Sequence, residues 1–201
     1  MLRFHRESKA WTQRELAKAA GYSERLVSKA EAGQSISAAA VADLAGALST
    51  AESPIYPEDL IVDPVQLAKE YIAAEHQQPG RVVDAIRHFL DEEIVIRLAG
   101  DPATIPFAGE HRGIAAVERV FELFYSILEV PAGHDHTPWY QYLGQGNEVI
   151  IWGKSWIHPI GHPMEKPLDL VHRMKFRRGK LIEVEVVFDT LEGSRVIKED
   201  G

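Results

Sequence analysis

The sequence predicts two domains of different fold class, an all-α unit followed by an α+β unit, within 201 residues. Three observations predict this division. Residues 12–33 read as two short amphipathic helices separated by a Gly-Tyr-Ser turn, and residues 49–64 contain three prolines that interrupt the helical periodicity. From residue 65 onward, helical periods give way to a succession of strand-like runs. We therefore expect domains at residues 1–50 and 65–201, joined by a linker at 51–64.

The helix pair at residues 12–33 carries start and stop signals at the expected places. Thr12 can cap the first helix while Glu15 reaches back to the cap, which is the reciprocal capping box. Gly21 can adopt the positive φ that ends a helix without steric cost. Ser23 can then cap a second helix, on which Val27 faces inward. The pattern predicts two helices joined by a tight turn.

This segment resembles the Cro/repressor-type helix-turn-helix family, also called XRE, over residues 2–49. The resemblance implies an all-α, five-helix, repressor-like domain with its helices at residues 2–9, 12–20 and 23–32 and two closing helices within 36–48. The helix at 23–32 would be the recognition helix. The resemblance also implies an ion pair between Arg6 and Glu31, which we interpret as structural because it ties two small helices together.

In that resemblance, the recognition helix enters the major groove of DNA with its N-terminus first. The residues assigned to DNA are Gln13, Arg14, Ser23, Glu24, Arg25, Ser28 and Lys29. Arg25 can read guanine, whereas Glu24 departs from the basic or small polar residues common at its position, so the base sequence stays open. The alternative interpretation is an ordinary amphipathic helix pair with no DNA role.

Charge separates the two expected domains. Residues 1–50 contain seven Lys or Arg against five Asp or Glu, whereas the whole chain carries a net charge of −8, so residues 51–201 carry −10. Contact with nucleic acid should therefore be confined to the N-terminal domain. One recognition helix covers only a few base pairs, so specific binding calls for two copies on a pseudo-palindromic operator. We expect the remaining chain to form the homodimer.

Composition excludes several classes of protein. The chain has no cysteine, so it has neither disulfides nor thiolate metal sites, and 45% of its residues are hydrophobic, which is enough for conventional cores. It shows no charged-then-apolar leader and no uninterrupted run of eighteen apolar residues. The expected setting is cytoplasmic, with no membrane partner.

The second domain begins with helical periods and ends with strand-like ones. We expect helices at residues 65–76, 81–90 and 113–129 and strands at 93–98, 137–143, 148–158, 169–176 and 181–188. This order is typical of an α+β fold in which helices pack on one side of a curved antiparallel sheet.

Residues 106–113, 176–181 and 187–190 together resemble the SnoaL-like branch of the superfamily that includes ketosteroid isomerase and nuclear transport factor two. The resemblance covers about residues 65–197 and implies a cone that leaves an apolar cavity for a small hydrophobic ligand. The candidate ligand-binding residues are Trp139, Trp152, Trp156, His172, Phe188 and Asp189. Tryptophans alternating on strands equally suit a core or a sheet-to-sheet dimer interface.

Asp189 and His172 are the candidate acid–base residues, because related cyclases and isomerases place carboxylates inside the cone. Each has a simpler interpretation. Asp189 ends a strand and precedes a helix, which it can cap, and a hydrogen-bonded histidine can belong to a core. We therefore expect no catalytic residue.

A competing interpretation starts from His134, Asp135 and His136, because His-x-His followed by a later Glu and His is how cupin domains bind metal. Here Gln141 stands where the Glu should be, and the helices at 65–90 and 113–129 are foreign to a predominantly β barrel. We expect neither a metal nor a cofactor.

The sequence therefore predicts a dimeric, sequence-specific DNA-binding transcriptional regulator that responds to a small apolar ligand in its C-terminal domain, and not an enzyme. One alternative is an isomerase or cyclase with an attached DNA-binding domain, which burial of Asp189 beside an open cavity, with a second proton donor in reach, would favour. Another is a cone filled by its own side chains that serves only to dimerise.

Overall fold

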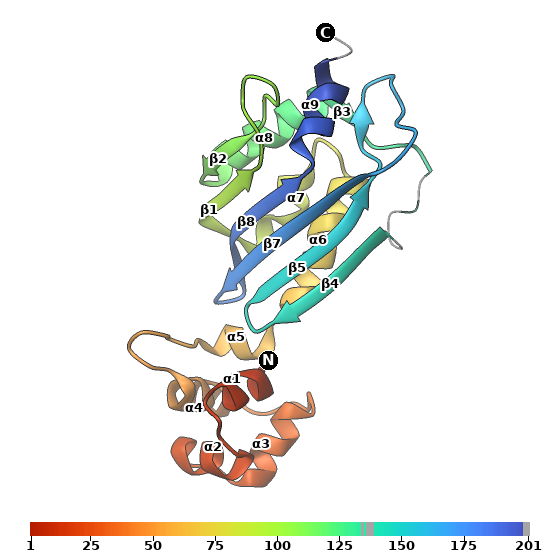
Figure 1. The fold of residues 1–201 in the computed structure, drawn as a ribbon. Helices are drawn as coiled ribbons and strands as arrows, with labels where there is room; N and C mark the ends of the chain where they lie inside the picture. Colours follow the sequence, from red (N-terminus) through yellow and green to blue (C-terminus); the bar gives the residue numbers. More distant parts are fainter. Residues whose placement is uncertain (134, 136–138, 199–201) are drawn as a thin grey trace. The chain divides into compact units, whose positions relative to one another are not determined.

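The computed structural model describes residues 1–133, 135 and 139–198. Its contacts divide the chain into two compact units. The first comprises Met1–Pro64 with the short segments Gln145–Asn147 and Arg177–Gly179, and the second comprises Val65–Gly144, Glu148–Phe176 and Lys180–Gly201. Figure 1 shows the elements of both units. Each unit is described by itself below.

The N-terminal unit is built from short helices around a small apolar core. Its helices are α1 (Leu2–Ser8), α2 (Gln13–Ala20), α3 (Glu24–Glu31), α4 (Ala38–Leu48) and α5 (Pro57–Ile61). Leu16 of α2, Val27 of α3 and Leu44 of α4 are fully buried and pack in one cluster. The inward positions of the predicted helix pair are therefore the ones that form the core.

The capping signals read from the sequence are present in the structure. Thr12 accepts a hydrogen bond from the Glu15 backbone N–H at 3.2 Å, and the Glu15 carboxylate accepts one from the Thr12 N–H at 2.7 Å. Gly21 ends α2 in the left-handed conformation at φ 75°. Ser23 then caps α3 by accepting from the Leu26 N–H at 3.3 Å. These bonds set the turn between the two helices.

The closing part of this unit differs from the expectation of two helices within residues 36–48. A single helix, α4, is capped by Ser37 and runs through an unbroken Ala- and Leu-rich stretch to Leu48. The fifth helix, α5, lies instead in the segment predicted as a linker, where Pro57 occupies its first turn and Asp59 accepts from the Tyr56 N–H. Ile55 and Leu60 of this segment pack against the core of the unit.

The C-terminal unit begins with helices and continues mainly with strands. The elements are α6 (Pro64–Gln77), α7 (Val82–Ile86), the 3-10 helix η1 (Arg87–Phe89), β1 (Leu90–Leu98), β2 (Gly109–Arg112), α8 (Ile114–Ile127), β3 (Leu128–Glu129), β4 (Tyr140–Gln145), β5 (Glu148–Ser155), β6 (His158–Pro159), β7 (Leu168–Arg177), β8 (Lys180–Phe188) and α9 (Thr190–Lys198). The predicted order of helices followed by strands is confirmed. The short strand β2, which was not among the expected strands, pairs with β1.

Six strands form the main sheet in the order β2-β1-β8-β7-β5-β4, and β3 pairs with β6 in a second, two-stranded sheet. β1–β2 and β5–β7 are antiparallel, with Trp152 opposite Val171 in the second pair. β1 and β8 are parallel, with Ile96 opposite Val184. The sheet is thus mainly antiparallel, and its parallel pair was not predicted because it joins strands from the two ends of the unit.

Helices α6, α7 and α8 lie on one side of the main sheet (Figure 1), and the core fills the space between them and the strands. Ala68 and Ile72 of α6 and Val117 of α8 are fully buried there against Val149 and Leu181 of the sheet. Gly153 of β5 has a packing role, because an added Cβ would lie 2.2 Å from the Tyr140 ring. The absence of a side chain at Gly153 leaves room for that ring.

None of the helices in the described parts of the chain is long and apolar enough to cross a membrane.

Candidate DNA-reading surface and ligand cavity

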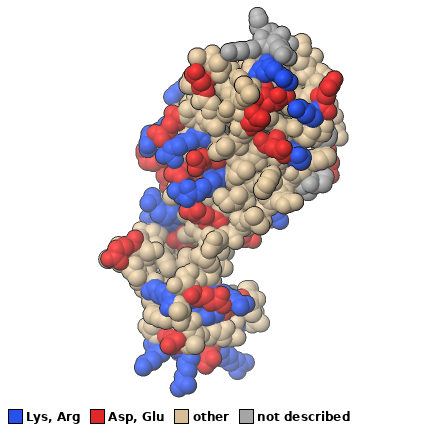
Figure 2. All heavy atoms as spheres, viewed as in Figure 1, with Lys and Arg blue, Asp and Glu red and all other residues tan. Residues whose placement is uncertain are grey.

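Helix α3 presents a polar surface at the N-terminal unit. Glu24, Arg25, Ser28 and Lys29 are exposed along it, while Val27 points into the core. Figure 2 shows Lys and Arg side chains projecting from the part of this unit that carries α2 and α3. Exposed basic and hydroxyl side chains on one short helix match what base edges and phosphates of a major groove accept.

Two further residues predicted to contact DNA are exposed as well, but a third is engaged inside the protein. The Arg14 side chain is exposed on α2, and Ser23 is exposed while its hydroxyl caps α3. The Gln13 side-chain amide donates to Glu31 at 2.9 Å. Because that N–H is already used, Gln13 presents less of its amide to a phosphate than its place in the sequence indicated.

The expected ion pair between α1 and α3 is present. The Arg6 guanidinium donates to Glu31 at 2.6 and 3.1 Å and to the Trp11 carbonyl oxygen at 2.6 Å. Burial by itself would raise the pKa of Glu31, but the hydrogen bonds from Arg6 and Gln13 outweigh that effect and the pKa is lowered. The pair therefore stays charged and holds α3 at a fixed place relative to α1.

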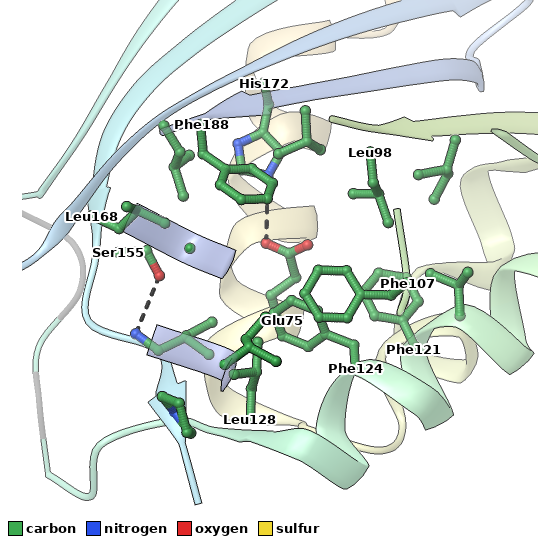
Figure 3. A pocket seen from close by; sticks show the side chains of 18 of the residues that line it. Glu75, Leu98, Phe107, Phe121, Phe124, Leu128, Ser155, Leu168, His172 and Phe188 are labelled. Carbon is green, nitrogen blue, oxygen red and sulfur yellow. Dashed lines mark hydrogen bonds and ion pairs between the residues drawn. The ribbon is translucent and has the colours of Figure 1, made fainter. Parts of the chain in front are cut away.

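The C-terminal unit contains an apolar cavity of about 120 Å³ (Figure 3). Side chains of α6, α8, α9 and the concave side of the main sheet line it. Most are apolar, among them Phe107, Phe121, Phe124, Leu170 and Phe188. The polar lining residues are Tyr71, Glu75, Tyr140, Ser155 and His172. An apolar cavity with a few convergent polar groups is the usual form of a small-molecule site.

Glu75 is the functional candidate that the sequence reasoning missed. Only 15% of its side-chain surface is accessible, and desolvation raises the pKa of its carboxyl to about 8, although the Tyr71 hydroxyl hydrogen-bonds to it and lowers that pKa. A signal for it was present, because Ala68, Tyr71, Ile72 and Glu75 fall on one helical stripe that is otherwise apolar. A carboxylate on such a stripe points inward.

His172 lies on β7 with its Nε2 atom 3.9 Å from the Glu75 Oε2 atom (Figure 3). Burial lowers the pKa of this imidazole to about 4, so the ring is neutral at pH 7. Its Nδ1 atom has no hydrogen-bond partner among the described residues. His172 and Phe188, two of the predicted ligand-binding residues, line the cavity.

Asp189 does not line this cavity. It is exposed, and its Oδ1 atom accepts from the backbone N–H groups of Leu191 and Glu192 at 3.1 Å each. The carboxylate is therefore the cap of α9, which was the simpler of its two interpretations.

The three tryptophans also lie outside the lining of the cavity. Trp139 and Trp156 contact each other edge to face, with ring centroids 6.2 Å apart. Trp152 is 62% exposed, because it points away from the neighbouring buried Ile151 on the same strand. Period-two spacing placed Trp152 and Trp156 on one face, but β5 ends at Ser155, so the alternation does not reach Trp156.

The candidate metal site includes residues that the structure does not describe. His134 and His136 are not among the described residues, so the structure does not address them. Within residues 1–133, 135 and 139–198, no group of three or more His, Cys, Asp or Glu side chains is arranged to hold a metal ion.

Comparison with known proteins agrees with both halves of this description. Residues 1–54 match the family described as "Helix-turn-helix domain". No match was found among curated proteins. Among solved structures, an NTF2-like protein from Burkholderia xenovorans LB400 is 21% identical over 67% of this chain and 95% of its own, with a TM-score of 0.55.

Two other solved structures give the same result. An NTF2-like protein of unknown function from Burkholderia pseudomallei K96243 is 18% identical over 68% of this chain and 99% of its own, with a TM-score of 0.56. TerC, co-crystallised with polyporic acid, is 17% identical over the same shares, with a TM-score of 0.55. At these identities the likeness concerns the fold. The chain thus carries a helix-turn-helix domain at residues 1–54, followed by a unit with the NTF2-like fold, and these are the two folds that the resemblances implied.

Proposed function

We propose that this protein is a dimeric, sequence-specific transcriptional regulator of the XRE type whose C-terminal domain senses a small, mainly apolar molecule. The observation that carries the proposal is the presence, in one chain, of a recognition helix with exposed Arg25, Ser28 and Lys29 and of an apolar cavity that holds convergent polar groups. The proposed partners are double-stranded DNA, a second copy of the chain and the small molecule. Reading DNA in a bacterial-type cell makes the proposed role cytoplasmic.

The outer face of the main sheet supports the dimer. Leu143, Trp152 and Val187, from strands β4, β5 and β8, are at least half exposed, and Val171 lies opposite Trp152 in the register. Ion pairs beside them link neighbouring strands, as between Lys154 and Asp169. An apolar centre with a charged rim is how interfaces are commonly built, and one self-complementary face is enough for a two-fold dimer.

The cavity supports the sensing role. Its apolar lining favours a hydrophobic body, and its few polar atoms can orient one polar group. TerC, which shares the fold, was crystallised with a small organic molecule. A ligand can alter operator affinity only through its differential affinity for two conformations of the dimer, so the proposal requires that ligand and DNA binding be thermodynamically linked.

Selection from a random duplex library with the full-length protein tests the DNA-binding part. The salt concentration is fixed and stated, because phosphate contacts make the affinity strongly salt-dependent. We expect an enriched site with two-fold symmetry and half-sites about one helical turn apart. Failure to enrich any sequence at low salt would contradict the regulator proposal, whereas an enriched asymmetric site would contradict the dimer alone.

A second function is favoured by one specific observation, namely the buried Glu75 carboxyl with the His172 imidazole beside it in the cavity. Two titratable groups whose pKa values are pushed apart are typical of acid–base catalysis, and an isomerase-type enzyme would use them to move a proton next to a carbonyl. Exchange of the α-protons of cyclohexanone for deuterium, followed by NMR, tests it. The enzyme proposal expects exchange that Glu75→Gln abolishes, and the regulator proposal expects none above buffer.

A further inference from the structure

Among the described residues, no Lys or Arg pairs with the Glu75 carboxyl, although buried carboxylates normally have a positive partner. Among the described residues that line the cavity, Glu75 is the only acidic side chain, and none is a lysine or an arginine. Buried Glu residues are rare unless they are paired, because an unpaired charge in an apolar site is costly. The cavity side of this carboxyl is therefore a place where a bound positive charge would find a counter-ion.

The groups that face Glu75 from the surrounding elements do not supply that charge. Tyr71 of α6 hydrogen-bonds to the carboxyl, and the Tyr125 hydroxyl of α8 donates to the Glu75 backbone carbonyl at 2.6 Å. Tyr140 and Tyr142 of β4 are near enough to interact electrostatically with Glu75. These hydroxyls are neutral donors, and the remaining neighbour, the His172 imidazole, is neutral as well.

The rest of the cavity is suited to a cation. The rings of Phe107, Phe121, Phe124 and Phe188 surround the space into which the carboxyl points (Figure 3). Aromatic faces attract cations, most strongly where water is excluded.

The size of the cavity limits the body of the ligand. Its volume of about 120 Å³ is close to that of an engineered cavity of about 150 Å³ that holds benzene. A single ring or a short alkyl body fits this space.

We propose that the cavity binds a small organic monocation, an ammonium group carried on one ring or a short alkyl body, with Glu75 as its counter-ion. This inference rests on the proposed ligand-sensing function and specifies the chemical class of the ligand. The ammonium group donates hydrogen bonds to the Glu75 carboxylate, and the phenylalanine rings enclose the apolar body. A neutral or anionic molecule of the same shape lacks the first of these interactions.

Binding of such a cation is coupled to a proton. At pH 7 most of the empty protein carries a protonated Glu75, because the pKa of that carboxyl is about 8. The cation binds the ionised form, so each binding event releases close to one proton. The apparent affinity therefore rises about tenfold per pH unit below pH 8 and levels off above it.

Calorimetry on the full-length protein with three matched probes tests the proposal. The probes are benzylammonium chloride, benzyl alcohol and sodium benzoate, which share one ring and differ in charge. Each is titrated at pH 7 in two buffers of different ionisation enthalpy, which reports the number of protons released. We expect benzylammonium to bind tightest and to release close to one proton, with benzyl alcohol weaker by about tenfold or more and benzoate weakest.

Two variants complete the test. Glu75→Gln keeps the shape of the side chain, and it should lose both the preference for benzylammonium and the proton release, while its affinity for benzyl alcohol is unchanged or improved. Glu122→Gln removes an exposed carboxylate from α8 and should behave as the parent protein. Circular dichroism verifies that each variant is folded. If Glu75→Gln does not fold, the order of affinity of the three probes for the parent protein still tests the proposal.

The outcomes separate this inference from the proposed function. Binding of benzyl alcohol or benzoate as tight as that of benzylammonium would overturn the cation assignment and leave a ligand-sensing regulator in place. No binding of any probe would overturn the inference that the cavity takes a one-ring ligand. Selection of an operator does not involve any of the three probes. Its failure would therefore contradict the proposed regulator function and would leave the cation assignment untouched.

Discussion

The two units of this protein carry their functional side chains in opposite ways. In the N-terminal unit, exposed residues of one eight-residue helix form the candidate DNA-reading surface. In the C-terminal unit, Glu75 and His172 come from a helix and a strand far apart in the sequence and meet in a buried cavity. The difference teaches that a surface site follows from a local motif, whereas an interior site exists only after the strands and helices have packed.

The pH dependence of stability is the largest expected effect and concerns the interior site. The carboxyl of Glu75 has a pKa of about 8 in the fold, against an ordinary value of 4.5, so the folded protein holds this proton more tightly than the unfolded chain. The free energy of unfolding contributed by this group is therefore greatest at low pH and is lost as the pH rises from about 4.5 to 8. The Glu75→Gln variant has no carboxyl at this position and does not suffer this loss. The free energy of unfolding of the variant minus that of the parent should therefore be roughly 4 kcal/mol larger at pH 9 than at pH 5.

Urea unfolding at pH 5, 7 and 9, followed by tryptophan fluorescence, measures this difference. The lowered pKa of His172 acts in the opposite sense, because its contribution is lost as the pH falls from 6.5 to about 4. That contribution is present in both proteins and so largely cancels in the comparison. Glu122→Gln is the control, and parallel pH profiles for Glu75→Gln and the parent would refute the buried, protonated carboxyl.

Substitution of Trp152 by Glu asks whether the surface site depends on the other unit. A charge placed among Leu143, Val171 and Val187 should split the proposed dimer and lower operator affinity about a hundredfold, which is about 2.7 kcal/mol. Sedimentation and fluorescence anisotropy with the selected operator measure the two effects. Leu123→Glu makes the same change at a 38%-exposed position on α8 and should alter neither. A dimer that survives Trp152→Glu would place the interface elsewhere.

Arg25→Ala examines the surface site directly. Loss of a guanidinium that reads a base should cost about 1 to 3 kcal/mol of operator affinity and relax the preference at one base position. The control is Arg119→Ala, which removes another exposed helical arginine from the C-terminal unit. If Arg25→Ala and Arg119→Ala bind the selected operator equally well, Arg25 does not contact a base.

Thr12→Ala gives the smallest effect and tests the local origin of the N-terminal fold. The substitution removes the hydrogen bonds between the Thr12 hydroxyl and Glu15, so it should lower the free energy of unfolding of this unit by about 1 kcal/mol. Thr12→Ser keeps a hydroxyl and should retain most of the parent's stability. Chemical denaturation followed by far-ultraviolet circular dichroism measures both variants. An alanine variant as stable as the parent would show that packing, and not capping, sets the start of α2.

Much of the N-terminal unit could be predicted because its signals are local. Thr12, Gly21 and Ser23 act through neighbours within five positions, so the sequence alone indicates where α2 ends and α3 begins. The engagement of the Gln13 amide by Glu31 could not be read in this way, since it depends on how the helices pack. The order of elements in the C-terminal unit could also be predicted, because the spacing of apolar residues that marks helices and strands is a local signal as well.

The candidate cavity was harder to predict because its members are chosen by packing. Strand alternation selected His172, which lines the cavity, but it also selected the tryptophans, which lie outside the lining. Asp189 was chosen from the family resemblance, and it caps α9. Glu75 was overlooked because a glutamate on a helix is ordinarily solvated. Its position on an apolar stripe was the physical signal, and that signal becomes decisive only when the cavity is known.

The parallel pairing of β1 with β8 has a consequence for how the protein is made. β1 lies near the start of the C-terminal unit, but the centre of the sheet is complete only when Leu90 and Leu98 have met Leu181 and Val186. Because translation adds roughly 5 to 20 residues each second, helices α1 to α4 leave the ribosome on the order of ten seconds before β8 does. Helices α2 and α3 can thus form while the main sheet is still incomplete. Under the proposed function, a nascent chain in that interval has one recognition helix and no partner, and dimerisation through the sheet has to wait for β8.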